Sequence, residues 1–206
     1  MDKQYWNKFY NKESLSKDIS KCSSFALFCQ KKILKKPRTI AELGCGNGRD
    51  ALYFAKRGHS ILALDQCVDQ KVMDKRNHEN LEYLEEDFIN YKFNQDIDVF
   101  YSRFTIHSIT KEDQDKLLPN IYKSLPPKGL FCIEVRTTRD AKFGVGECVA
   151  ENTYANDEHK RRFVDSNVFV RDVLSIGFKV RYFTEEDNLS IYKDDNPVLM
   201  RLVLEK

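Results

Sequence analysis

Residues 42–48 have the composition of a ligand-binding turn, because three of the eight glycines fall within a stretch that reads Glu-Leu-Gly-Cys-Gly-Asn-Gly. Glycine lets a ligand approach the backbone closely, and a helix that starts after such a turn offers free N–H groups. A dinucleotide-binding turn would have its third glycine three residues after the second, where this chain has Arg49. The Gly-Lys-Ser/Thr of a P-loop does not follow the glycines either. The spacing therefore disfavours both kinds of phosphate site.

Acidic residues accompany this turn. Glu42 stands before the glycines, where it would repel a pyrophosphate and attract an ammonium group, so we expect a ligand with a cationic amino-acid head. Asp65 ends the next apolar run, about where such folds place an acid that accepts both ribose hydroxyls, although it could also cap a helix. Asp87 could accept an adenine amino group while the ring of Phe88 covers the base, or it could be a turn residue.

The elements that must position these residues alternate along the chain. Helical-looking segments at 49–57, 67–77 and 111–124 separate short apolar runs, which predicts parallel strands with helices on both faces. The turn signal Asp194-Asp195-Asn196-Pro197 predicts a final hairpin, hence one antiparallel strand. The fold class is thus α/β, a doubly wound sheet. The seven expected strands are residues 38–43, 60–64, 81–85, 97–101, 129–136, 178–184 and 197–204.

One segment interrupts the alternation. Residues 137–165 contain two glycines, mixed charge and no clear period, and they follow the fifth expected strand. Ligands of open α/β sheets bind beyond the carboxyl ends of the strands, which is where this insertion begins. We interpret it as an irregular element that covers the substrate; the alternative is a disordered loop.

At these residues the sequence resembles the class I S-adenosylmethionine-dependent methyltransferases, from about Tyr5 to the end of the chain. The resemblance implies a Rossmann-like, seven-stranded, mostly parallel sheet with an antiparallel last strand. It also implies S-adenosyl-L-methionine as cofactor, bound by Glu42, Gly44, Cys45, Gly46, Gly48, Asp65, Gln66, Asp87, Phe88 and Tyr101. Residues 5–10, 100–109 and 131–136 further resemble tellurite-resistance-type and capsular-polysaccharide-pathway small-molecule methyltransferases.

The residues after the fourth strand concern the acceptor. Methyltransferases that act on base amines or glutamine amides carry Asn/Asp-Pro-Pro-Tyr/Phe there, whereas this chain has Tyr101-Ser102-Arg103-Phe104. That difference argues against such acceptors. Catechol-type enzymes need carboxylates at this place to bind a divalent metal, so we expect no metal site.

Arginines are concentrated near the predicted acceptor pocket. Arg103 and Arg136 stand at strand ends and Arg161 and Arg162 in the insertion, and forked guanidinium groups suit carboxylate or phosphate oxygens. His107 stands four residues after Arg103, so both share a face if a helical turn starts there, and we expect both to be catalytic. His107 could instead be a structural imidazole below the pocket, and each arginine a solvated surface charge.

The aromatic residues Tyr5 and Trp6 precede every expected strand, and we expect the segment 1–36 to cap the site. A ring there could attract the sulfonium of the cofactor by a cation–π interaction or bury the adenosyl group, with substrate contacts nearby. Plain packing of the segment on the sheet is the alternative.

Composition limits the classes of protein. A chain of 206 residues fits a single domain, 1–206, and a formal net charge of +2 disfavours nonspecific nucleic-acid binding. The longest apolar run has five residues, so we expect no membrane span and no secretory signal. The six cysteines form no CxxC pair, which favours reduced thiols and a cytoplasmic protein.

The sequence therefore predicts an S-adenosylmethionine-dependent methyltransferase that acts on a small anionic acceptor bearing a phosphate, phosphoramidate or carboxylate. The finer resemblance suggests a role in capsular polysaccharide biosynthesis. Two alternatives remain at this stage, a protein that binds the cofactor without transfer and a nicotinamide-dependent oxidoreductase. Oligomeric state is left open.

Overall fold

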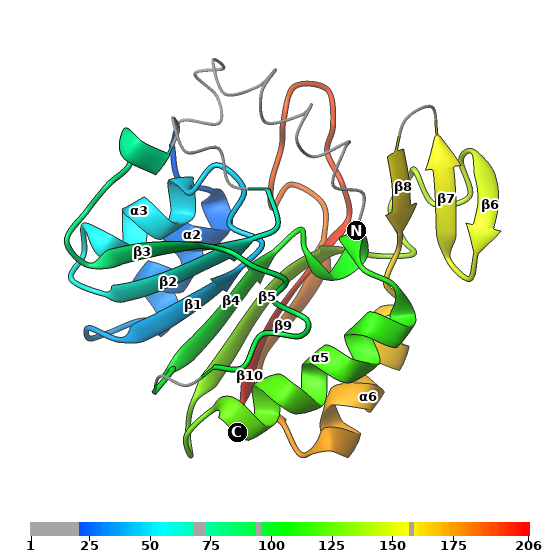
Figure 1. Cartoon of the computed structure of the whole chain (residues 1–206). Coiled ribbons are helices and arrows are strands. Elements are labelled where there is room, and N and C mark those ends of the chain that lie inside the picture. Colours follow the sequence, from blue (N-terminus) through cyan, green and yellow to red (C-terminus); the bar gives the residue numbers. More distant parts are fainter. Residues whose placement is uncertain (1–20, 68–72, 94–95, 157–158) are drawn as a thin grey trace.

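The computed structural model describes residues 21–67, 73–93, 96–156 and 159–206. Its centre is a seven-stranded sheet of order β3-β2-β1-β4-β5-β10-β9, so the fold class predicted from the sequence is confirmed (Figure 1). β10 is antiparallel to both of its neighbours, β5 and β9, as the predicted hairpin requires, and the remaining neighbours in the sheet are parallel. The strands are β1 (Thr39–Leu43), β2 (Ser60–Asp65), β3 (Leu81–Glu85), β4 (Val99–Arg103), β5 (Leu130–Arg136), β9 (Lys179–Glu186) and β10 (Leu199–Glu205).

Helices cover both faces of this sheet (Figure 1). One face carries α2 (Ser24–Phe28), the π-helix η2 (Cys29–Ile33) and α3 (Arg49–Ala55), and the other carries α5 (Lys111–Ser124) and α6 (Ser166–Ile176). Successive strand residues point to opposite faces, so Phe100 packs into the core on the α5 side and Tyr101 into the core on the α2 side. No helix within the described ranges is long and apolar enough to cross a membrane.

The insertion after β5 is regular, which corrects the expectation of an irregular segment. It forms a three-stranded antiparallel sheet of β6 (Glu147–Ala150), β7 (Thr153–Asn156) and β8 (His159–Arg162), which stands apart from the central sheet (Figure 1). Edge-to-face contacts among Phe143, Tyr154 and Phe163, with centroids 5.3–6.2 Å apart, hold it together. A bridge between Thr137 and Val164 brings its two ends together beside β5.

Candidate active site

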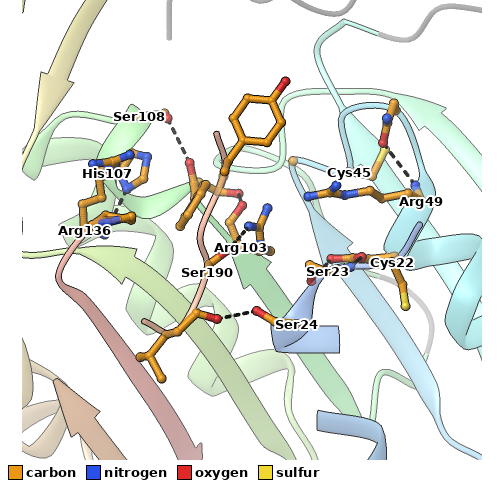
Figure 2. Close-up of a pocket in the computed structure, with 18 of the residues that line it drawn as sticks. Cys22, Ser23, Ser24, Cys45, Arg49, Arg103, His107, Ser108, Arg136 and Ser190 are labelled. Carbon is orange, nitrogen blue, oxygen red and sulfur yellow. Dashed lines mark hydrogen bonds between the residues drawn. The ribbon is translucent and has the colours of Figure 1, made fainter. Parts of the chain in front are cut away.

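A cavity of about 570 Å³ opens at the carboxyl ends of the parallel strands, where open α/β sheets bind their ligands. Its wall includes the glycine turn after β1, residues 22–24 at the start of α2, the end of β4, the short 3₁₀ helix η3 (Ile106–Ser108) and the loop between β9 and β10 (Figure 2). Residues far apart in the sequence thus meet at one edge of the sheet. Within the described ranges, no three His, Cys, Asp or Glu side chains are grouped so as to hold a metal ion.

The glycine turn contains two positions, 44 and 48, where a residue other than glycine would be strained and would clash with a neighbouring side chain. Gly44 has φ +72°, and a Cβ there would lie 2.8 Å from Thr105 Oγ1. Gly48 has φ +69°, and a Cβ there would lie 2.5 Å from the hydroxyl of Tyr83. The amides of Gly44 and Cys45 both donate to the carbonyl of Leu64, at 2.8 and 3.0 Å, which fixes the turn on β2. The turn is therefore fixed in place, and neither glycine leaves room for a side chain.

Glu42 lies in β1 just before this turn, and its residue is 4% exposed. Its Oε2 is buried and has no hydrogen-bond partner in the described part of the chain. Burial, reinforced by the nearby Asp50, raises the pKa of Glu42 well above the usual range. A buried carboxylate oxygen without a partner is costly unless a ligand supplies a donor, and a cationic group would also restore its ionisation. Glu42 therefore fits an ammonium group in the cavity.

Asp65 ends β2 and also lines the cavity. Its Oδ2 accepts the amide of Gly46 at 2.8 Å, and its Oδ1 accepts the amide of Cys67 at 2.9 Å. Burial raises the pKa of Asp65, while these backbone donors oppose that rise. Each carboxylate oxygen has a second lone pair, so this group can still accept the two hydroxyls of a ribose.

The remaining expected cofactor residues are placed differently. Gly46, Gly48, Gln66, Asp87, Phe88 and Tyr101 do not line the cavity, whereas Glu42, Gly44, Cys45 and Asp65 do. The carboxylate of Asp87 accepts the amide of Ile89 at 3.1 Å and the side chain of Asn90 at 2.7 Å, as a turn residue does. The ring of Phe88 is fully buried in the core on the α5 side, so it cannot cover a base from there.

Asp50, in the first turn of α3, was not predicted from the sequence. It is 3% exposed and accepts the amide and the hydroxyl of Ser23, both at 2.6 Å, and the hydroxyl of Tyr101 at 2.8 Å. Tyr101 is buried against Phe25, so its hydroxyl binds Asp50 from the core and its ring does not face the cavity. Ser23 lies in the cavity wall (Figure 2), so these hydrogen bonds fix the start of α2 there.

Arg103 ends β4 and shares a buried carboxylate with Arg201 of β10. Glu134, which is fully buried, accepts Nε of Arg103 at 2.9 Å and Nε of Arg201 at 2.7 Å. Nη2 of Arg103 donates to Ser190 Oγ at 2.8 Å (Figure 2). Nη2 of Arg201 donates to the carbonyl of Leu189, also at 2.8 Å. The two guanidinium groups therefore position the loop between β9 and β10.

The residue after Arg103 has a strained backbone. Phe104 has φ +58°, a backbone conformation that residues other than glycine seldom adopt and that is often retained at functional sites. Its ring lines the cavity and lies 4.1 Å below the guanidinium of Arg103, which is a cation–π contact.

Arg136 and Arg161 line the cavity, but Arg162 does not. Arg136 is paired with Asp140 at 2.9 Å and with Asp195. Arg162 donates to the carbonyls of Ile109 and Ile106 and to Gln114 Oε1, at 2.7–2.9 Å. Its side chain is committed to structural hydrogen bonds on the other side of β8, so the expected contact of Arg162 with an acceptor is wrong.

His107 lines the cavity and is 3% exposed. Its Nδ1 accepts the amide of Arg136 at 3.2 Å, so a neutral ring carries its proton on Nε2 (Figure 2). This arrangement suits a structural or hydrogen-bond-donating imidazole and does not suit the expected general base. Tyr5 and Trp6, expected to contact the substrate, lie outside the described residues.

Comparison with known proteins identifies the fold that builds this cavity. Residues 41–133 match the family model described as a methyltransferase domain. In this part the chain resembles the class I S-adenosylmethionine-dependent methyltransferases. An uncharacterised methyltransferase of Oceanobacillus iheyensis is 23% identical over 106 residues, 50% of each chain. The (S)-coclaurine N-methyltransferase of Thalictrum flavum subsp. glaucum is 24% identical over 61% of this chain and 36% of that protein.

Solved structures agree with this methyltransferase fold over nearly the whole chain. The 1,6-didemethyltoxoflavin-N1-methyltransferase of Burkholderia thailandensis, solved with its substrate and S-adenosylhomocysteine, aligns with a TM-score of 0.72 and 16% identity. The alignment covers 98% of this chain and 87% of that one. By contrast, the alignments with the two curated relatives above span only half of one and about a third of the other. The finer resemblance to tellurite-resistance-type and capsular-pathway enzymes stays a prediction.

Proposed function

We propose that this methyltransferase transfers the methyl group of S-adenosylmethionine to a small anionic acceptor. The observation that carries the proposal is the buried Glu42 carboxylate, one oxygen of which has no partner among the described residues and which lies beside the glycine turn and Asp65. Glu42 would bind the ammonium group of the cofactor and Asp65 the ribose. The bound cofactor supplies an electrophilic methyl group on a sulfonium.

The chain's own contribution to the reaction is positional. The glycine turn and Asp65 would hold the cofactor on one side of the cavity, while Phe104, His107 and the loop between β9 and β10 enclose the acceptor on the other. Holding two reactants in line can supply roughly 7–11 kcal/mol of the barrier. His107 lines the cavity and would help to orient the acceptor, whose proton would leave to water.

We call the part of the cavity near Phe104, His107 and the loop between β9 and β10 its acceptor half. The charge around this half supports an acceptor that carries an anionic group. Arg103 and Arg201 share the single carboxylate of Glu134, so this buried set keeps an excess positive charge. Arg161 adds a further guanidinium from the insertion. A phosphate, phosphoramidate or carboxylate would complement these groups. A role in capsular polysaccharide biosynthesis, in the cytoplasm, is proposed from the finer resemblance of the sequence.

A transfer assay with two cofactors tests the proposal. Thermal melting with S-adenosylmethionine and with NAD, followed by transfer of radiolabelled methyl to carboxylated, phosphorylated and neutral alcohols and amines, separates the alternatives. We expect stabilisation by S-adenosylmethionine alone and labelling of an anionic acceptor. Asp65→Ala should weaken the stabilisation, whereas Glu82→Ala, at an exposed position of β3, should not. Stabilisation by NAD, or tight cofactor binding with no acceptor labelled, would favour one of the two rivals.

A further inference from the structure

Arg136 holds two carboxylates of very different character. Asp140 has a side chain only 2% exposed, and its second oxygen accepts the amide of Lys142 at 2.8 Å. Asp195 comes from the loop between β9 and β10, and its side chain is 29% exposed. Both Arg136 and Asp195 line the acceptor half of the cavity. Arg136 thus has one fixed partner and one partner that a ligand could replace.

We propose that Arg136 is an anion subsite of the acceptor pocket that Asp195 fills in the free protein, and that a carboxylate or phosphate of the acceptor takes the place of Asp195. This inference rests on the proposed function, because it names how the same pocket recognises its acceptor. The side chain of an aspartate and a ligand carboxylate present the same two oxygens to a guanidinium fork.

After this exchange, Arg136 and Asp195 would each still have a counter-ion. Lys142, whose side chain is 51% exposed, binds the other oxygen of Asp195 at 2.8 Å, so the displaced carboxylate keeps a counter-ion at the rim. Burial would raise the pKa of Asp195, but hydrogen bonds from Lys142 and Arg136 lower it, so the group is an anion at neutral pH. Arg103 could not exchange in this way, because its carboxylate, Glu134, is fully buried.

Displacement of Asp195 would also move the wall of the pocket. The amide of Tyr192 donates to the carbonyl of Asp195 at 3.0 Å, and the amide of Asp195 donates back at 2.9 Å, so this turn is a closed unit. Tyr192 and Ile191 line the cavity, and Ile191 is 61% exposed. An acceptor that binds Arg136 would therefore shift the side chains that surround it.

Anion binding to variants of the full chain tests the subsite. Acetate and inorganic phosphate are titrated by NMR into the protein with and without S-adenosylhomocysteine. Asp195→Asn should bind one of the two probes at least tenfold more tightly than the wild type, because the competing tethered carboxylate is gone. The control Asp194→Asn removes the same charge from the exposed neighbouring residue, which forms no ion pair within the described part of the chain, and should stay within twofold.

A second pair of variants locates the bound anion. Arg136→Met in the Asp195→Asn background should abolish the gain, and Asp195→Ser should reproduce it if Asp195→Asn folds poorly. Equal affinities of Asp195→Asn and Asp194→Asn, or a gain that survives Arg136→Met, would overturn the inference. Titration without cofactor keeps this result separate from the proposed function, which fails instead if S-adenosylhomocysteine does not bind.

Discussion

Replacement of Glu134 by Gln should destabilise the protein far more than its small change in shape suggests. Glu134 is fully buried and is the carboxylate shared by Arg103 and Arg201, whose side chains are 15% and 8% exposed. The amide keeps the volume of the side chain but leaves two buried guanidinium groups without a counter-ion. Breaking a buried ion pair in this way costs about 3–5 kcal/mol. For a chain of this length that corresponds to a fall in Tm of about 6–20 °C.

The assay is urea and thermal unfolding of the variant beside a matched control. Glu112→Gln makes the same chemical change in the pair with Lys116 at 2.8 Å on α5, where the Glu112 side chain is 80% exposed. Exposed pairs one helical turn apart contribute about 0.3–0.5 kcal/mol, so the control should be almost neutral. Limited proteolysis should cleave the loop at residues 188–192 faster in Glu134→Gln, because Leu189 and Ser190 lose well-oriented donors. A Glu134→Gln variant within 1 kcal/mol of the control would refute this account of the buried charges.

Three further predictions concern the glycine turn, the pH dependence of stability and cofactor binding, and the insertion. Gly48→Ala should lower the unfolding free energy beyond the ~1–2 kcal/mol of left-handed strain and weaken S-adenosylhomocysteine binding, whereas Gly58→Ala, at φ +81° with nothing within 4 Å, should cost the strain alone. Since burial raises the pKa of Glu42 above its unfolded value, stability should fall as pH rises through the folded pKa while calorimetric cofactor affinity rises, and Glu42→Gln should flatten both trends. Arg162→Met should cost about 2 kcal/mol or more in chemical unfolding, against almost nothing for Arg171→Met at a side chain 75% exposed.

The strands and the glycine turn could be predicted because their signals are local. Apolar runs bounded by turn residues mark strands that are buried on both faces, and a hairpin follows from the turn at residues 194–197. The small sheet of the insertion has no such signal, since every residue of β6 is exposed and its strands have four residues each. Strand pairing and contacts among aromatic residues distant in sequence, such as Phe143 and Phe163, bring it together.

The site was predicted in part. Glu42 and Asp65 stand at the carboxyl ends of β1 and β2, so the fold itself brings both acids to the cavity. The partners of the arginines depend on tertiary structure, and Asp195 and Glu134 could not be matched to them by spacing. One signal was available, because Glu134 and Arg201 are charges inside apolar strands, and a charge buried there requires a counter-ion. Asp50 gave no comparable signal, since an acid in the first turn of a helix is common.

Calorimetric titration of S-adenosylhomocysteine into the wild type and Glu42→Gln tests the central claim most directly. Because Oε2 of Glu42 has no hydrogen-bond partner in the described part of the chain, the substitution removes an ionisable carboxyl group without breaking a contact of that oxygen. We therefore predict that Glu42→Gln melts at or above the wild-type temperature and binds the ligand at least tenfold more weakly, a loss of about 1.4 kcal/mol. Equal affinity of the two proteins, or no binding to the wild type, would contradict the assignment of this cavity to the cofactor.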